Sequence, residues 1–182
     1  MKRYILLLGI LALFSSKGFA QADNVFTTVP VVNGKVVFQQ FIHAGTNLSD
    51  EQKYAVLSQW AKDNFPAGAS LLSIRFDENN KSVTVNAKTN LSLPQNKSTT
   101  MTYRFDTTIG NMGCMLVIRD ISYQLGGGKP AGFVKPTMAE SVITDSTISS
   151  ASANDKDTYN AVAKSTIAFC NQLYGKLNKV FE

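Results

Sequence analysis

Residues 81–89 read KSVTVNAKT and residues 99–106 read TTMTYRFD, and these two stretches decide the fold. In both of them apolar and polar side chains alternate. A period of two is typical of strands that bury one face and leave the other in water, as antiparallel sheets do. The pattern assigns to the buried face Val83, Val85, Met101, Tyr103 and Phe105. It assigns to the open face Thr84, Asn86, Lys88, Thr102 and Arg104.

Turn-forming residues flank these strands on both sides. Residues 77–80, 94–97 and 110–113 are rich in Gly, Asn, Asp and Pro, and they separate further strand candidates at 71–76 and 114–123. Short runs of this kind joined by turn signals predict hairpin-connected neighbours. The centre of the chain is therefore predicted to be a four-stranded antiparallel meander.

The segment ahead of the meander predicts a hairpin and then a helix. Asn33-Gly34 lies between two apolar runs and predicts the turn of the hairpin. The second arm of this hairpin continues through Ile42 as a strand. Ser49-Asp50-Glu51-Gln52 is a capping box, which predicts a helix to about Asn64. That helix carries an apolar stripe at helical spacing and ends before a proline and a glycine. The stripe consists of Tyr54, Leu57, Ala61 and Phe65, widened by Val56 and Trp60.

A second helix is predicted from Asp155 to about Val180, where apolar residues recur every three or four positions. The expected order is β-α-β-β-β-β-α. This order predicts an α+β fold, with an antiparallel sheet of about five strands and two helices packed on one face. We expect a single domain over 29–182, a loose segment at 21–28 and a long loop at 125–153.

The first 20 residues have the composition of a secretory signal peptide. Lys2 and Arg3 precede an 11-residue apolar run over 4–14, and Gly18-Phe19-Ala20 offers a small-x-small cleavage site. A membrane span needs roughly 20 apolar residues, so we expect cleavage at residue 20 and no transmembrane anchor afterwards. The expected location is the periplasm, the cell envelope or the extracellular space.

Loss of this leader changes the charge balance. The chain has 18 basic and 13 acidic residues, and Lys2, Arg3 and Lys17 leave with the leader, so 15 − 13 gives a net charge of +2. Binding to a duplex needs a concentrated basic surface. We therefore expect no nucleic-acid partner.

With these elements in place, the chain resembles a known family. The order of elements, the helix from Ser49 to Phe65 and the strand ending Asp120-Ile121-Ser122-Tyr123 are similar to exported bacterial proteins of domain-of-unknown-function family 4468, which have a fold like that of the TATA-binding protein (TBP). The resemblance covers roughly residues 30–124. It implies a TBP-like fold and export, and it transfers no functional residue, because the family has no assigned activity.

No catalytic, metal or cofactor site is predicted. His43 is the only histidine and no Cys-x-x-Cys occurs, so the ligands of a zinc site cannot be gathered. Gly126-Gly127-Gly128-Lys129 is followed by Pro130 rather than by a helix, which is unlike a phosphate-binding loop. Cys114 and Cys170 could form a disulfide, although the spacing of a helix on a sheet favours two buried free thiols.

Binding is the favoured function. We expect a non-enzymatic module that binds a protein or glycan through Thr84, Asn86, Lys88, Thr102 and Arg104, or through Phe133 and Met138 in the long loop. One alternative is an envelope hydrolase that uses scattered carboxylates, with Asp106 and Asp120 as the candidate pair. The other alternative is a structural envelope protein that associates with itself.

Overall fold

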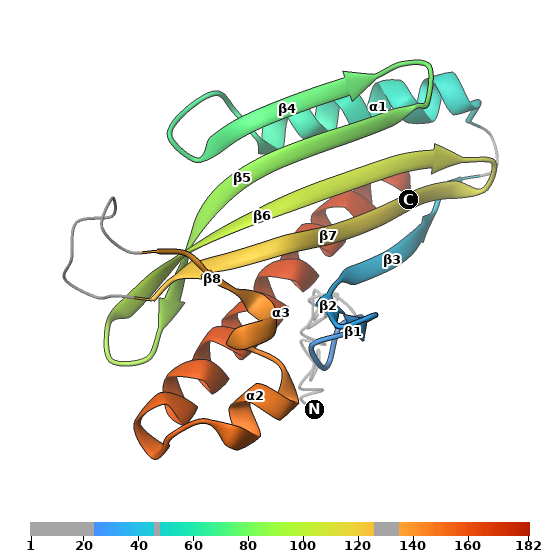
Figure 1. The fold of residues 1–182 in the computed structure, drawn as a ribbon. Coiled ribbons are helices and arrows are strands. Elements are labelled where there is room, and N and C mark those ends of the chain that lie inside the picture. The colour runs from blue at the N-terminus through green and yellow to red at the C-terminus, as the bar shows by residue number, and fades with distance from the viewer. Residues whose placement is uncertain (1–23, 46–47, 126–134) are drawn as a thin grey trace, which may run out of the picture.

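The computed structural model describes residues 24–45, 48–125 and 135–182. Its main element is a six-stranded antiparallel sheet with the strand order β3-β7-β6-β5-β4, to which β8 adds on the same side of β7 as β3 (Figure 1). The strands are β3 (Phe38–His43), β4 (Leu71–Asp77), β5 (Ser82–Leu93), β6 (Lys97–Gly110), β7 (Gly113–Gln124) and β8 (Thr137–Met138). The α+β class and the central meander are confirmed, and the sheet has more strands than the five expected.

The helices lie on one side of this sheet. α1 (Asp50–Asn64) packs against β5 and β6, and α3 (Ala153–Phe181) packs against β3, β5 and β7 (Figure 1). The core between the layers is formed by the inward half of the alternating pattern, which is fully or almost fully buried. It includes Val83, Val85, Met101, Tyr103, Phe105, Leu57, Trp60 and Leu177. Within the described residues, none of the helices has both the length and the apolarity needed to cross a bilayer.

Local signals set the start of α1. The Ser49 side chain accepts from the Gln52 amide at 3.3 Å, and the Gln52 side chain accepts from the Ser49 amide at 2.9 Å. Two of the amide groups that the first turn leaves unpaired are thereby satisfied. The predicted capping box is confirmed, and Tyr54, Leu57 and Ala61 of the predicted stripe are buried.

The predicted Asn-Gly hairpin is also present. β1 (Val31–Val32) pairs with β2 (Lys35–Val36) as a separate two-stranded ribbon. Asn33 and Gly34 have φ of 50° and 73°, the left-handed backbone that a type I′ turn requires at both positions. After β2 the chain joins the main sheet as β3.

The segment at 125–153 differs from the long loop that we expected. Besides β8 it contains a 3₁₀ turn, Ala139–Ser141, and a short helix, α2 (Asp145–Ser150). Ala139, Val142 and Ile143 are completely buried, and Glu140 accepts a hydrogen bond from the Val36 amide at 3.1 Å. These buried apolar side chains fold the second half of the segment onto the domain, so the loop prediction is wrong for residues 137–150.

The expectation of a loose segment at 21–28 is wrong at Phe26. This residue is 6% exposed, and its ring lies edge-on to Phe38 at 5.2 Å. Its backbone amide donates to the Asn171 side chain, and its carbonyl accepts from that same side chain, each at 2.9 Å. A buried asparagine of α3 therefore clamps the start of the described chain.

Candidate functional site

The face of the sheet that points away from α1 and α3 is the first candidate site, and we call it the open face. The outward half of the alternating pattern lies on it, as the cross-strand pairs Thr84–Asp106, Asn86–Arg104 and Lys88–Thr102 show. All five residues predicted for an open sheet face are thus brought together on one side of β5 and β6. Their role in binding stays a prediction.

A charged cluster occupies the middle of this face, and we call it the Asp106 cluster (Thr84, Arg104, Asp106 and Arg119). The Asp106 carboxylate accepts from Thr84 Oγ1 at 2.8 Å and from Nε of Arg104 and of Arg119 at 2.9 Å each. Burial pushes the pKa of Asp106 upward, but the hydrogen bonds from Arg119, Thr84 and Arg104 outweigh it and hold the pKa below its usual range. The cluster fixes two guanidinium groups against one carboxylate.

Sequence reasoning missed Arg119 as part of this site. Arg119 lies directly opposite Arg104, whereas the pairing of Thr102 with Ser122 is displaced by one residue. Asp120, with a φ of 53°, provides the extra residue of a β-bulge in β7. Without the bulge, a strict period of two would place Arg119 and Ser122 on opposite faces. The signal for Arg119 was the alternation within β7 itself, in which Met115, Val117 and Arg119 are partly exposed and alternate with buried residues, because the bulge lies beyond Arg119.

The candidate carboxylate pair does not form a paired acid and base. Asp106 is held by three donors, and Asp120 is an exposed residue of the bulge. A general acid would need a raised pKa, whereas that of Asp106 is lowered. These observations leave the hydrolase alternative without the residues on which it was based.

In the part of the chain that the structure describes, histidine and cysteine side chains also offer few candidates for catalysis or metal binding. His43 ends β3, with its ring edge-on to Phe41 at 4.9 Å. Cys114 and Cys170 are buried free thiols, as the sequence favoured, and burial raises the pKa of Cys114 to about 12. No group of three or more possible metal ligands occurs within the described residues.

Met138, from the partner site predicted in the long loop, lies next to the open face. Met138 pairs with Ser122, and the row continues through Thr102 to Lys88. Met138 is 42% exposed, so it extends the open face beyond β7. Phe133, its predicted companion, lies outside the described residues.

The edge of the open face near β3 combines the apolar Phe41, Met115 and Val117 with the exposed Gln39 and His43. Phe41 pairs with Met115, and Gln39 pairs with Val117, which lies opposite Asp106. Phe41, Met115 and Val117 are partly exposed side chains, since no described element covers this side of the sheet. The open face therefore has a hydroxyl-rich half on β5 and β6 and a half on β3 and β7 that mixes apolar side chains with Gln39 and His43, with the Asp106 cluster between them.

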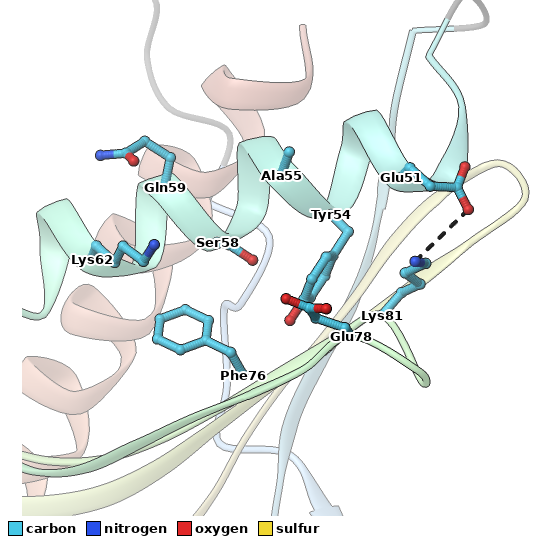
Figure 2. Close-up of a pocket in the computed structure, with 9 residues that line it drawn as sticks. All are labelled: Glu51, Tyr54, Ala55, Ser58, Gln59, Lys62, Phe76, Glu78 and Lys81. Carbon is cyan, nitrogen blue, oxygen red and sulfur yellow. Dashed lines mark ion pairs between the residues drawn. The ribbon is translucent and has the colours of Figure 1, made fainter.

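A second candidate site is a groove between α1 and the edge strand β4, with a volume of about 500 Å³ (Figure 2). We call it the α1–β4 groove. It is lined by Glu51, Tyr54, Ala55, Ser58, Gln59, Lys62, Phe76, Glu78 and Lys81. The lysines at its two ends each lie over an aromatic ring: Lys62 over Phe76 at 5.4 Å, and Lys81 over Tyr54 at 5.7 Å. Lys81 also pairs with Glu51 at 3.8 Å.

Two hydroxyl groups in this groove lack partners. The Tyr54 hydroxyl and Ser58 Oγ are buried atoms without a hydrogen bond, one helical turn apart on α1. Figure 2 shows both side chains reaching from the helix into the space above the sheet. Buried polar atoms without partners are uncommon in folded proteins, so this pair marks the groove as distinct from ordinary surface.

The fold defined by this sheet and its helix layer is TBP-like. The solved structure of a TBP-like protein from Parabacteroides distasonis superimposes with a TM-score of 0.70 at 23% identity, over 84% of this chain and 96% of that chain. A DUF4468 family protein from Bacteroides ovatus gives a TM-score of 0.65 at 16% identity, over 84% and 90%. No protein-family model and no curated protein matches the sequence. The likeness to family 4468 that the sequence indicated is thereby confirmed as a likeness of fold.

Proposed function

We propose that this chain is an exported, non-enzymatic module that binds a protein partner through its open face. The observation that carries the proposal is the composition of that face. Arg104 and Arg119 are fixed at its centre by Asp106, with Phe41 and Met115 on one side and threonine and asparagine side chains on the other. Arginine, aromatic residues and methionine are enriched at protein interfaces, with polar side chains at the rim.

Pre-ordered arginines favour binding, because holding a long side chain in place before contact reduces the entropy lost on association. The two guanidinium groups bond Asp106 through Nε, so each keeps further N–H donors that a partner can use. A glycan is less well supported, because sugar recognition relies on exposed rings, whereas Phe41 is half-buried against His43.

Site-specific photocrosslinking tests the open face. A photoreactive residue is placed at Asn86 or at Thr102, and the matched control carries it at Gln172, an exposed position of α3 in the helix layer. In the cells that make the protein, we expect one discrete adduct from both open-face positions and none from Gln172. Adding Lys88→Glu should weaken the adduct strongly, since Lys88 neighbours Thr102 on this face.

Three outcomes would count against the proposal. An adduct from Gln172 alone would place the partner on the helix layer. An adduct of twice the chain mass would favour self-association. Equal labelling at all positions would mean that the open face is only solvated.

The export part of the proposal rests on the leader at residues 1–20. Mass spectrometry of the protein recovered from the envelope fraction should show a chain that begins at Gln21. A chain that retains Met1 or Lys2 in the cytosolic fraction would refute export and leave the binding proposal standing.

A further inference from the structure

The α1–β4 groove runs beside an unpaired sheet edge. β4 is the terminal strand of the sheet, and no described strand pairs with its outer side. Alternate residues of an edge strand turn their N–H and C=O groups away from the sheet, where an added strand can bind them. α1 packs over β5 and β6, and the groove lies between this helix and the end of β4 at Phe76.

We propose that this edge and groove form a peptide-binding site. An extended segment of a partner protein pairs with β4 and places one acidic side chain in the α1–β4 groove, against Tyr54, Ser58 and Lys62. This site is separate from the open face, so it stands or falls independently of the function proposed above.

The unpartnered hydroxyls give the first argument. Tyr54 is only 8% exposed, and neither its hydroxyl nor Ser58 Oγ has a hydrogen-bond partner. A buried hydroxyl without a partner has lost its hydrogen bond to water and made no other. This desolvation costs free energy, which a ligand that supplies an acceptor would recover. Both residues line the same groove and lie one helical turn apart on α1, so an acceptor that enters the groove comes near both.

The charges give the second argument. Lys62 forms no ion pair within the described residues, and its ammonium lies over the Phe76 ring. A carboxylate offers acceptors to a lysine and to two hydroxyls at once, and its charge matches that of Lys62. Glu51 and Glu78 also line the groove, and Glu51 is engaged by Lys81. They disfavour a run of acids, so the fitting peptide carries one acidic residue rather than several.

The strand edge gives the third argument. A peptide that adds to an edge gains main-chain hydrogen bonds, and every second side chain points to one layer. On β4 the residues that face the helix layer are Ile74 and Phe76, which pair with the core residues Val85 and Val83. Side chains of an added strand with the same orientation enter the space beside α1. The bulge between Leu71 and Ser73 restricts regular pairing to residues 73–77.

Selection from a random nonapeptide library against the purified protein tests the site. We expect enrichment of peptides in which one Asp or Glu is flanked by strand-forming residues. Binding of the best peptide should weaken about tenfold in Tyr54→Phe and in Lys62→Met, the loss expected for one hydrogen bond to a charged group. Lys164→Met, at an exposed lysine of α3, is the matched control and should bind as the wild type does.

A second measurement separates strand addition from simple capture of a carboxylate. N-methylation of alternate amides in the best peptide should abolish binding, and the bound peptide should slow amide exchange within Ser73–Asp77. N-acetylglutamate amide alone should bind at least a hundredfold more weakly than the peptide, since it offers few main-chain bonds.

The proposal would be overturned by any of four results. These are no enrichment over the Tyr54→Phe/Lys62→Met double variant, enriched peptides without an acid, unchanged binding after N-methylation, and slowed exchange on β6 and β7 instead of β4. The last result would transfer the peptide to the open face and would leave the function proposed above intact. Tyr54→Phe keeps the ring in the core, so a folded variant is expected, and circular dichroism confirms it.

Discussion

The Asp106 cluster and the α1–β4 groove are both polar regions at the boundary of the core, and they differ in how far their hydrogen bonds are made. In the cluster, one carboxylate receives three donors between 2.8 and 2.9 Å. In the groove, two buried hydroxyls have no hydrogen-bond partner, and Lys62, which lines the same groove, forms no ion pair within the described residues. The hydrogen bonds of the cluster contribute to the stability of the isolated protein. The donors of the groove contribute none until a ligand binds them.

This difference separates two kinds of functional surface. A completed cluster gives a rigid surface whose shape is the same before and after binding, which suits a large flat contact. Hydrogen-bond donors without an acceptor favour a ligand that carries the matching acceptor. Perturbing each region in turn should therefore give opposite patterns, in which the cluster affects stability and the groove affects binding.

The largest effect is expected from Asp106→Ala. This change removes the acceptor of Thr84, Arg104 and Arg119 and leaves two guanidinium groups adjacent to each other. We expect a loss of about 1–2 kcal/mol in the free energy of unfolding, at the low end for a charged network because the arginines face solvent. Urea unfolding at pH 7 measures it. A variant as stable as the wild type would show that the cluster does not contribute to the free energy of unfolding.

The pH dependence of stability should change next. Since the pKa of Asp106 is lowered by folding, the contribution of the cluster is present above about pH 5 and is lost as the pH falls through the lowered pKa. Wild-type stability should therefore decline more steeply between pH 5 and pH 2 than that of Asp106→Asn. Urea unfolding at each pH measures both curves, and parallel curves would contradict the shift.

A pair of matched Tyr→Phe variants compares a satisfied hydroxyl with an unsatisfied one. The Tyr123 hydroxyl lies 2.8 Å from Thr166 Oγ1 in the core, so Tyr123→Phe should cost about 1 kcal/mol of stability. The Tyr54 hydroxyl has no partner, so Tyr54→Phe should leave stability unchanged or raise it slightly. Thermal unfolding of both variants decides the matter. Equal destabilisation would mean that Tyr54 is bonded in solution and would weaken the case for the groove.

The smallest effect is expected from Ser58→Ala. Ser58 lies inside α1, where alanine has the higher helix propensity by a few tenths of a kcal/mol, and no hydrogen bond of its side chain is lost. Stability should therefore be equal or marginally higher, whereas binding of the selected acidic peptide should weaken. A stability loss above about 1 kcal/mol would place Ser58 among ordinary structural residues.

The sequence predicts the elements whose signals are local. The capping box at Ser49, the Asn33-Gly34 turn and the alternation of β5 and β6 depend on residues within a few positions of one another. For that reason the class of fold and the two sides of the sheet follow without any knowledge of tertiary contacts.

The features that were missed depend on distant residues. Arg119 joins the Asp106 cluster through its pairing with Arg104 across β6 and β7, and Ala139 and Ile143 are buried by elements remote in sequence. The sequence pattern places Tyr54 in an apolar stripe. Periodicity does not show whether the Tyr54 hydroxyl has a hydrogen-bond partner. The open face was predictable as a set of residues, and the α1–β4 groove was not.

The clamp between Phe26 and Asn171 has a consequence for the order of folding. It joins residues separated by 145 positions, and β3, near the start, pairs with β7 near residue 118. Contacts that close such long stretches of chain form slowly, and the Phe26–Asn171 contact cannot form before residue 171 of α3 has been synthesised. An emerging chain therefore lacks this contact until Asn171 is available, which would leave the start of the domain unclamped during the export proposed above.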